Sequence, residues 1–232
     1  MKELGYNFVR LGVTWAGAQP QQGGELDAAW VGRLTAFLEL AHAHGIAVLL
    51  DAHQDAVGSA VCGEGVPMWF SKIATPEAIG RPLWPLPKQK DGSCGRSDKD
   101  GWAKFAGDPD YNIKNPCCRV SNQGSWGNLI TTVQAQETMA YLFSAKGRQH
   151  YANFMGKLAK AVDGFPAAVG IELMNEPPAL QRDAMYSTWR ECYEAIRGNS
   201  SSLAVVRQRV SMRLLFCDSP SNKNTHIQTH RA

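Results

Sequence analysis

The sequence predicts an α/β fold built around a parallel sheet. Three observations predict it: short continuous apolar runs, helical periodicity between those runs, and glycine or proline where one element gives way to the next. Strands covered on both faces read as continuous apolar runs. Alternation of strand and helix implies right-handed crossovers, and the order of elements suits either a doubly wound sheet or part of a barrel.

The first strand and the first helix occupy about 45 residues. Residues 7–13 (NFVRLGV) form a short apolar strand, and Asp27 is placed to cap the helix that follows. Apolar residues then recur at spacings of three and four, so they share one helix face. Gly45 suits the left-handed conformation that ends a helix. The apolar face consists of Trp30, Leu34, Phe37, Leu38 and Ala41.

The second strand is the apolar run 46–50 (IAVLL), and a stretch without clear periodicity follows it over about 52–129. A structureless loop of this length is unusual inside a compact domain. It is either a functional insertion or a region whose elements leave no recognisable pattern. Helical periodicity returns before Lys146 and continues after Gly147. The apolar positions of the later part are Tyr151, Phe154, Met155, Leu158 and Val162.

A third strand and a last helix complete the regular part, residues 1–197. Residues 168–174 (AVGIELM) form the strand, and Gly198 closes the helix. In the tail, 198–232, the segments LAVV and VSMRLLFC are candidate strands, whereas the polar end is expected to be poorly ordered. The apolar face of the last helix consists of Met185, Trp189, Cys192 and Ile196.

The charge of the chain gives no reason to expect a nucleic-acid partner. The formal net charge is +3, but residues 1–197 hold 19 basic and 20 acidic residues, so the excess lies in the tail. That tail is either an interaction arm or a solvated end. No apolar run approaches the roughly 20 residues of a membrane helix, so we expect no integral membrane segment. The sequence does not indicate an oligomeric state.

Four of the six cysteines fall between residues 62 and 118, without the spacing of a zinc site. Their clustering suggests disulfides that pin a long loop, and hence a secreted or endomembrane-lumen protein, with free thiols as the equal alternative. The first residues (MKELGYNFVRLGV) lack the features of a signal peptide and read as the interior of a domain.

Polar residues follow each predicted strand, at the end where α/β folds gather reactive groups: 14–15, 51–55 and 175–178. The third group is the most specific. Pro177 cannot donate to the ladder, so the strand stops and Glu176 is placed at the mouth of the sheet. A general acid needs this placement to reach a leaving oxygen. The simpler alternative is that the segment only ends the strand.

Four segments together resemble the retaining β-glycosidase clan that includes the cellulase-like glycoside hydrolase family 5. NFVRLGVTW (7–15), IAVLLDAHQD (46–55) and GIELMNEP (170–177) resemble the second, third and fourth barrel strands of that family. The HQD triplet followed by GEGVPMW (63–69) is most similar to the endoglycoceramidase-like branch. The resemblance spans about residues 4–197 and implies an incomplete (β/α)8 TIM barrel, approximately strands 2 to 4 with their helices and an unmatched tail.

The resemblance also implies roles for four residues at the strand ends. Glu176 would be the catalytic acid/base, and Asn175 would hydrogen-bond the sugar 2-hydroxyl. His53 would line the subsite of the sugar that is cleaved. Arg10 would orient the nucleophilic carboxylate and keep it ionised. The alternatives are that Arg10 only pairs with Glu172 and that His53 only packs.

Four further residues are candidates for binding sugar or lipid: Asp55, Trp69, Trp102 and Trp126. Flat aromatic faces suit both kinds of ligand, although any one loop tryptophan is more often a packing residue. The chemistry requires no metal or cofactor. The sequence GEGVP is not followed by a glycine-rich helix start, so a dinucleotide site of the Rossmann type is improbable.

A retaining glycosidase needs a second carboxylate, and the family's nucleophile is a glutamate on the seventh strand. No glutamate follows Glu194, and Asp218 is the only carboxylate of the tail. A half barrel also leaves sheet edges and apolar helix faces uncovered. We therefore expect this chain alone to be weakly stable and inactive. The expected substrate is a β-linked glycolipid such as a glycosylceramide or sterol glucoside, or else a cellulose- or mannan-like polymer. A non-catalytic carbohydrate- or glycolipid-binding remnant is the alternative function.

Overall fold

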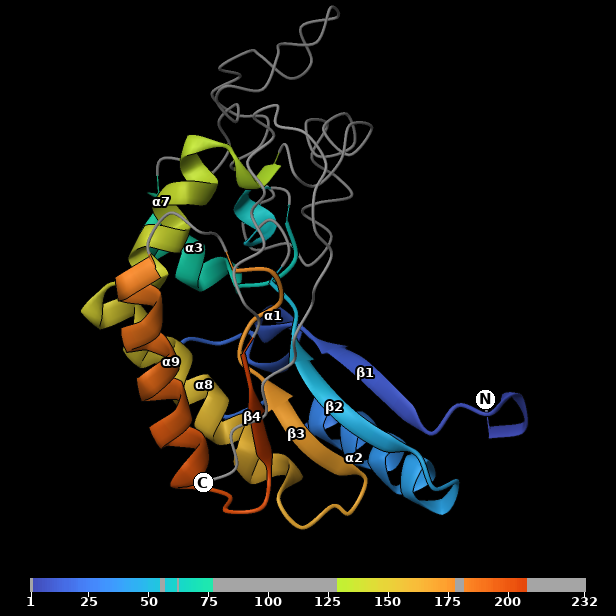
Figure 1. Cartoon of the computed structure of the whole chain (residues 1–232). Helices are drawn as coiled ribbons and strands as arrows, with labels where there is room; N and C mark the ends of the chain where they lie inside the picture. The colour runs from blue at the N-terminus through green and yellow to red at the C-terminus, as the bar shows by residue number, and fades with distance from the viewer. Residues whose placement is uncertain (1, 55–56, 62, 77–128, 178–181, 208–232) are drawn as a thin grey trace, which may run out of the picture.

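The structure is a computed structural model that describes residues 2–54, 57–61, 63–76, 129–177 and 182–207 (Figure 1). Its centre is a four-stranded sheet in which every neighbouring pair is parallel. The strands follow one another in chain order, so each crossover places the next strand beside the last, as in a barrel. They are β1 (Phe8–Val13), β2 (Ala47–Ala52), β3 (Ala168–Glu172) and β4 (Ala204–Val206).

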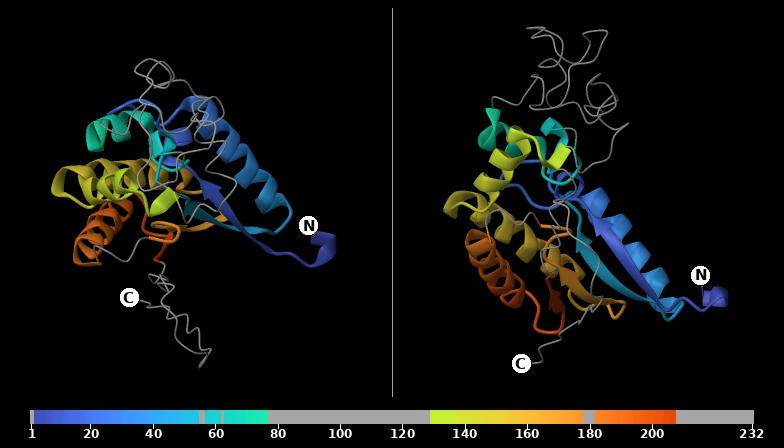
Figure 2. Two further views of the ribbon diagram at one scale, coloured as in Figure 1. Left: turned by 90° about the horizontal axis from the view of Figure 1, so that it is seen from above. Right: turned by 45° about the horizontal axis from the view of Figure 1, so that its top comes forward.

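Three longer helices provide the crossovers. The helix α2 (Ala28–Ala43) connects β1 to β2, α8 (Ala145–Val162) leads into β3, and α9 (Arg182–Arg197) leads into β4. Figures 1 and 2 show α8 and α9 packed side by side. None of the described helices is both long and apolar enough to span a bilayer. The shorter helices are η1 (Lys2–Leu4), α1 (Trp15–Ala18), η2 (Ser59–Val61), α3 (Met68–Ala74) and α7 (Val133–Leu142).

The predicted beginning and end of α2 are confirmed. A carboxylate oxygen of Asp27 accepts a hydrogen bond from the backbone N–H of Trp30 at 2.7 Å, as in a helix N-cap. Gly45 adopts a φ of 61°, the left-handed conformation that ends a helix. Leu34 and Leu38 lie in the core, so the apolar face of α2 covers the sheet.

The predicted apolar faces of α8 and α9 are also confirmed. All of the apolar positions assigned to them are buried in one core. The hydroxyl of Tyr151 donates to the carbonyl of Leu173 at 2.6 Å, which ties α8 to the end of β3. Trp15, immediately after β1, is fully buried, and its ring centroid lies 5.4 Å from that of Tyr151 and 5.6 Å from that of Phe154. The end of β1 is thereby anchored on α8.

The structure corrects two features of the predicted element order. The stretch 52–129 contains η2 and the helix α3, which is seven residues long and too short to show a helical period. Residues 77–128, and with them the cysteines at 94, 117 and 118, lie outside the described residues. The sheet has one strand more than the three predicted, because the candidate segment LAVV supplies β4 beside β3. Residues 208–232 also lie outside the described part.

Two helical glycines give a matched test of the packing. A side chain at buried Gly147, in the first turn of α8, would overlap the carbonyl group of Tyr141, whose carbon would lie 2.6 Å from the new Cβ. Gly32 in α2 is exposed and has open space at that position. We expect Gly147→Ala to lower the free energy of unfolding by about 2 kcal/mol and Gly32→Ala to raise it by up to about 1 kcal/mol. Urea unfolding measures both, and equal effects at the two positions would contradict this packing.

Candidate active site

Three charged side chains, one each from β1, β2 and β3, meet near the carboxyl end of the sheet. The register pairs Gly12 with Asp51 and Asp51 with Glu172, so both carboxylates lie in one row across the sheet. Arg10 precedes Gly12 by two residues and shares its face. Its Nε donates to Glu172 Oε2 at 2.7 Å, and its Nη2 lies 3.1 Å from Asp51 Oδ1. One guanidinium thus bridges two carboxylates.

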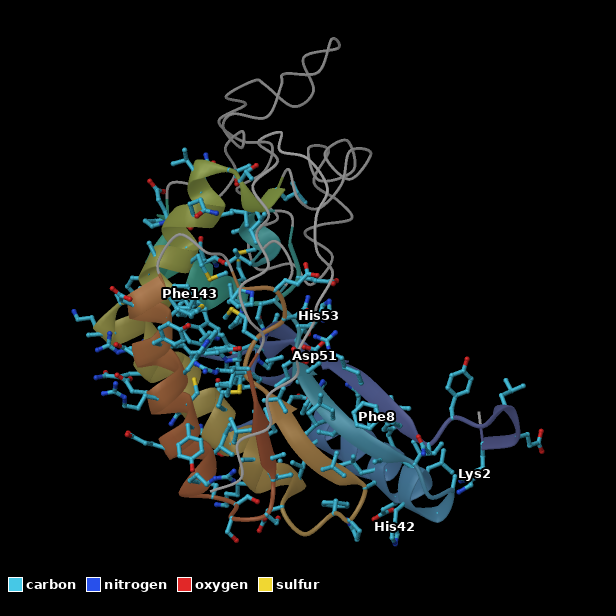
Figure 3. The ribbon with its side chains drawn as sticks, viewed as in Figure 1. Lys2, Phe8, His42, Asp51, His53 and Phe143 are labelled. Carbon is cyan, nitrogen blue, oxygen red and sulfur yellow. The ribbon has the colours of Figure 1, made fainter. Side chains whose placement is uncertain are left out.

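Two further polar side chains complete this group. His53 Nδ1 lies 2.6 Å from Asp51 Oδ2, and Figure 3 shows both residues at the same end of the sheet. Arg10 Nη2 donates to Asn175 Oδ1 at 2.8 Å. The backbone N–H of Asn175 donates to the carbonyl of Ala52, which fixes the loop after β3 against β2. We call Arg10, Asp51, His53, Glu172 and Asn175 the strand-end cluster.

The cluster is an electrostatic site as well as a geometric one. Asp51 and Glu172 are about 1% and 2% exposed, whereas the side chain of Arg10 is 37% exposed. Burial raises the pKa of Asp51, an effect that its contacts with His53 and Arg10 oppose. The hydrogen bond to Glu172, with the nearby carboxylates, raises the pKa of Arg10. Arg10 is therefore a permanent, partly exposed cation whose partners are buried.

Glu176 lies beside this cluster, in the loop after β3. Its side chain is exposed, and its charge is among those that raise the pKa of Arg10. Its backbone has a φ of 41°, a left-handed conformation that is strained for a residue with a Cβ. Strain of this kind concentrates at functional sites, where the surrounding structure holds it in place. An exposed carboxylate held beside a cation fits the position of a general acid/base.

The structure allows several predicted site residues to be placed. It brings together Arg10, His53 and Asn175, with Glu176 next to them, and it contains the Arg10–Glu172 pair that was the simpler alternative. Asp55, Trp102 and Trp126 lie outside the described residues.

Trp69, on α3, makes packing contacts. Its indole N–H donates to the carbonyl of Gln19 at 3.3 Å, and its ring meets Trp15 and His150 edge-on, each at 5.4 Å between centroids. The ring is still partly exposed. These contacts hold the indole rigidly without connecting it to the strand-end cluster.

Asp51 is the cluster residue that the sequence did not single out. It was predicted only as part of the polar segment 51–55 that follows the second strand. The signal for it is spacing: side chains two apart on a strand point to the same face, so Asp51 and His53 had to be neighbours. Its burial and its shared contact with Arg10 come from the tertiary structure.

Comparison with known proteins identifies related sequences. The chain matches the family described as Cellulase (glycosyl hydrolase family 5) over residues 1–230. Endoglycoceramidase I of Rhodococcus hoagii is 30% identical over 173 residues, which cover 75% of this chain and 27% of that protein. The endoglycoceramidase of Hydra vulgaris is 27% identical, with 76% and 31% covered. The chain thus spans about a third or less of the length of these relatives.

Solved structures share the fold. Endo-glycoceramidase II from Rhodococcus sp. in complex with ganglioside GM3 has a TM-score of 0.63 at 19% identity and covers 88% of this chain and 41% of that one. An endogalactoceramidase gives a TM-score of 0.58 at 22% identity, with 89% and 42% covered. At this level of identity the likeness is one of fold, and the four-stranded sheet with its helices is part of a (β/α)8 barrel.

The cluster predicts a stability cost for removing Arg10. In Arg10→Met, Asp51 and Glu172 would be buried without their cation. We expect a loss of about 2–3 kcal/mol at pH 7, less than for a fully buried pair because the arginine is partly exposed. The surface change Arg190→Met on α9 should cost less than about 0.5 kcal/mol.

The loss in Arg10→Met should depend on pH. Without the guanidinium, the pKa of Asp51 in the folded chain rises further above its unfolded value, so the folded chain binds the proton more tightly. The bound proton therefore stabilises the folded variant at low pH. This stabilisation is lost as the pH rises from the unfolded-state pKa of Asp51 through its folded-state pKa. The deficit should therefore shrink as the pH falls from 7 to 4, measured by urea unfolding at each pH. A deficit independent of pH would contradict the ion-pair account.

The backbone of Glu176 gives a separate test. Glycine adopts a positive φ without the steric cost that alanine meets, so Glu176→Gly should be more stable than Glu176→Ala by about 1 kcal/mol. At exposed Glu194, inside α9, the order should reverse by about the same amount. Urea unfolding of the four variants measures both differences. The same order at both positions would show that Glu176 is not held in the left-handed conformation.

Proposed function

The chain belongs to the cellulase family, glycosyl hydrolase family 5, and from this premise we propose that its strand-end cluster is the acid/base side of a site for a β-linked glycolipid. The observation that carries the proposal is the convergence of Arg10, His53 and Asn175 at the carboxyl end of a parallel sheet, with Glu176 beside them. Active sites of barrel enzymes lie at this end of the strands.

In this proposal Glu176 protonates the glycosidic oxygen and then activates a water molecule. The amide of Asn175 binds the sugar 2-hydroxyl. Its oxygen already accepts from Arg10, so its –NH2 group points away from the guanidinium and is suited to donate to a hydroxyl. His53 contacts the sugar that is cleaved. The tryptophans Trp69, Trp102 and Trp126, with Asp55, contribute to binding of sugar or lipid.

The proposed stereochemistry is retention, which requires a carboxylate nucleophile about 5 Å from the acid/base. The family resemblance puts that nucleophile on a strand without a match in this chain, and Arg10 would orient it. The polypeptide of residues 1–232 by itself is therefore proposed to bind its ligand without turnover. That makes a binding protein for carbohydrate or glycolipid the second candidate, favoured by the absence of any glutamate after Glu194.

A glycolipid is the proposed ligand because the similar proteins are named for it. Three of the relatives are endoglycoceramidases, and a glucosylceramidase of Cryptococcus neoformans is 28% identical over 205 residues. The proposed ligand has a β-linked glucosyl group on a lipid aglycone such as a ceramide or sterol. A β-glucan or mannan chain is the other substrate class that the family allows.

Binding of a short-chain glucosylceramide and of cellobiose, measured by calorimetry, tests the proposal. We expect the glycolipid to bind more tightly and Asn175→Ala to weaken its binding about tenfold, the effect of losing one hydrogen bond of about 1.4 kcal/mol. Glu176→Gln should retain binding, because the acid acts on the chemical step. Asn199→Ala, at the exposed end of α9, is the matched control and should change nothing.

Three outcomes would revise the proposal. Tighter binding of cellobiose would favour a polysaccharide substrate. No binding of either ligand would reject the sugar site. Release of ceramide by the wild-type chain but not by Glu176→Gln would contradict the proposed inactivity and would mean that the chain supplies its own nucleophile.

A further inference from the structure

We propose that Asp51 is a positioning residue that fixes the proton of His53 on Nδ1, so that Nε2 presents an acceptor to a sugar hydroxyl. The sugar-binding part rests on the proposed function, whereas the control of the tautomer rests on the geometry of the cluster alone.

The two oxygens of Asp51 are divided between two partners. Oδ1 lies 3.1 Å from Arg10 Nη2, and Oδ2 lies 2.6 Å from His53 Nδ1. Asp51 is about 1% exposed, so these contacts replace the solvation that its carboxylate loses. The contact between Arg10 and Oδ1 is an ion pair without hydrogen-bond geometry. The guanidinium is charged at every accessible pH, so its attraction for Oδ1 fixes which way the carboxylate points. An ionised carboxylate can only accept, and therefore Nδ1 of His53 must carry a proton. In the neutral imidazole, Nε2 is then the acceptor.

Among the described residues, the other charged and titratable groups near Asp51 leave this arrangement intact. Glu172, on β3, accepts a hydrogen bond from Nε of Arg10 and so holds the guanidinium in place. Glu176, in the loop after β3, also acts electrostatically on Arg10. Tyr151, on α8, is fully buried, and burial raises its pKa well above the usual range, so it brings no charge to Asp51.

This geometry predicts a reversal in Asp51→Asn. The positive charge of Arg10 attracts the amide oxygen and repels the –NH2 group, so the oxygen turns towards Arg10 and the –NH2 group towards His53 Nδ1. That nitrogen must then accept, which moves the proton of the neutral imidazole to Nε2. The same Asp-to-Asn exchange in a Ser-His-Asp triad leaves the geometry intact but gives the wrong tautomer. In this protein, the sugar subsite would then present a donor where it had an acceptor.

The tautomer can be read directly. We would record long-range ¹H–¹⁵N spectra of the 232-residue chain labelled at histidine, near pH 7.5, and assign His53 by its absence from His53→Gln. We expect protonation at Nδ1 in the wild type and at Nε2 in Asp51→Asn. The matched control is Glu172→Gln, which also removes a buried carboxylate from Arg10 but leaves the Asp51–His53 contact; its His53 should keep the wild-type tautomer.

Two results would overturn the inference: an Nε2–H tautomer in the wild type, which requires no variant to fold, or an unchanged tautomer in Asp51→Asn. Binding of the short-chain glucosylceramide is measured on the same samples, and Asp51→Asn should weaken it about tenfold. If the tautomer reverses but the wild type binds no glycolipid, the proposed function fails and the positioning role of Asp51 stands. If the glycolipid binds and the tautomer is independent of Asp51, the inference fails and the proposed function stands.

Discussion

The ion pairs of Arg10 with Glu172 and Asp51 are the constraint on which the site depends. Two carboxylates buried side by side at the ends of β2 and β3 would repel each other, and an arginine on β1 offsets that repulsion. The three residues come from three strands, so the pairing also fixes the order and register of the sheet at this end. The network continues to His53, which contacts Asp51, and to Asn175, which accepts a hydrogen bond from Arg10. The positions of both side chains therefore depend on the charged residues.

The apolar core supports this constraint from the other face of the sheet. Val48, Leu50 and Ala52 lie on the face of β2 opposite to Asp51 and are fully buried. Trp15 follows β1 directly and is enclosed by aromatic rings, including Phe70 of α3. Because the strand ends are held by dense packing, the polar side chains above them have little freedom. Charged groups can converge there because the scaffold below them is rigid.

The sequence predicted those parts of the fold that follow from local pattern. The α2 cap at Asp27, the left-handed Gly45 and the buried faces of α8 and α9 each follow from the spacing of a few residues. The helix α3 was missed because its seven residues make only about two helical turns, too few to show a clear helical period. Among the candidate site residues, the motif predicted Glu176, Asn175 and His53, and the structure places them near one another. Asp51 was missed because its role comes from register: only the pairing of three strands shows that it faces Arg10 and Glu172.

The remaining hydrogen-bond donors of Arg10 indicate which chemical group could still bind beside it. A guanidinium has five N–H donors, and the contacts of Arg10 with the described residues use Nε and Nη2. The donors of Nη1 are unused by that part of the chain, and the side chain is 37% exposed. An exposed cation with donors to spare near Glu176 suits a further carboxylate, and the proposed retaining mechanism requires one close to the acid/base. In the proposed function, the charge that holds the buried acids together is also the charge that orients the nucleophile.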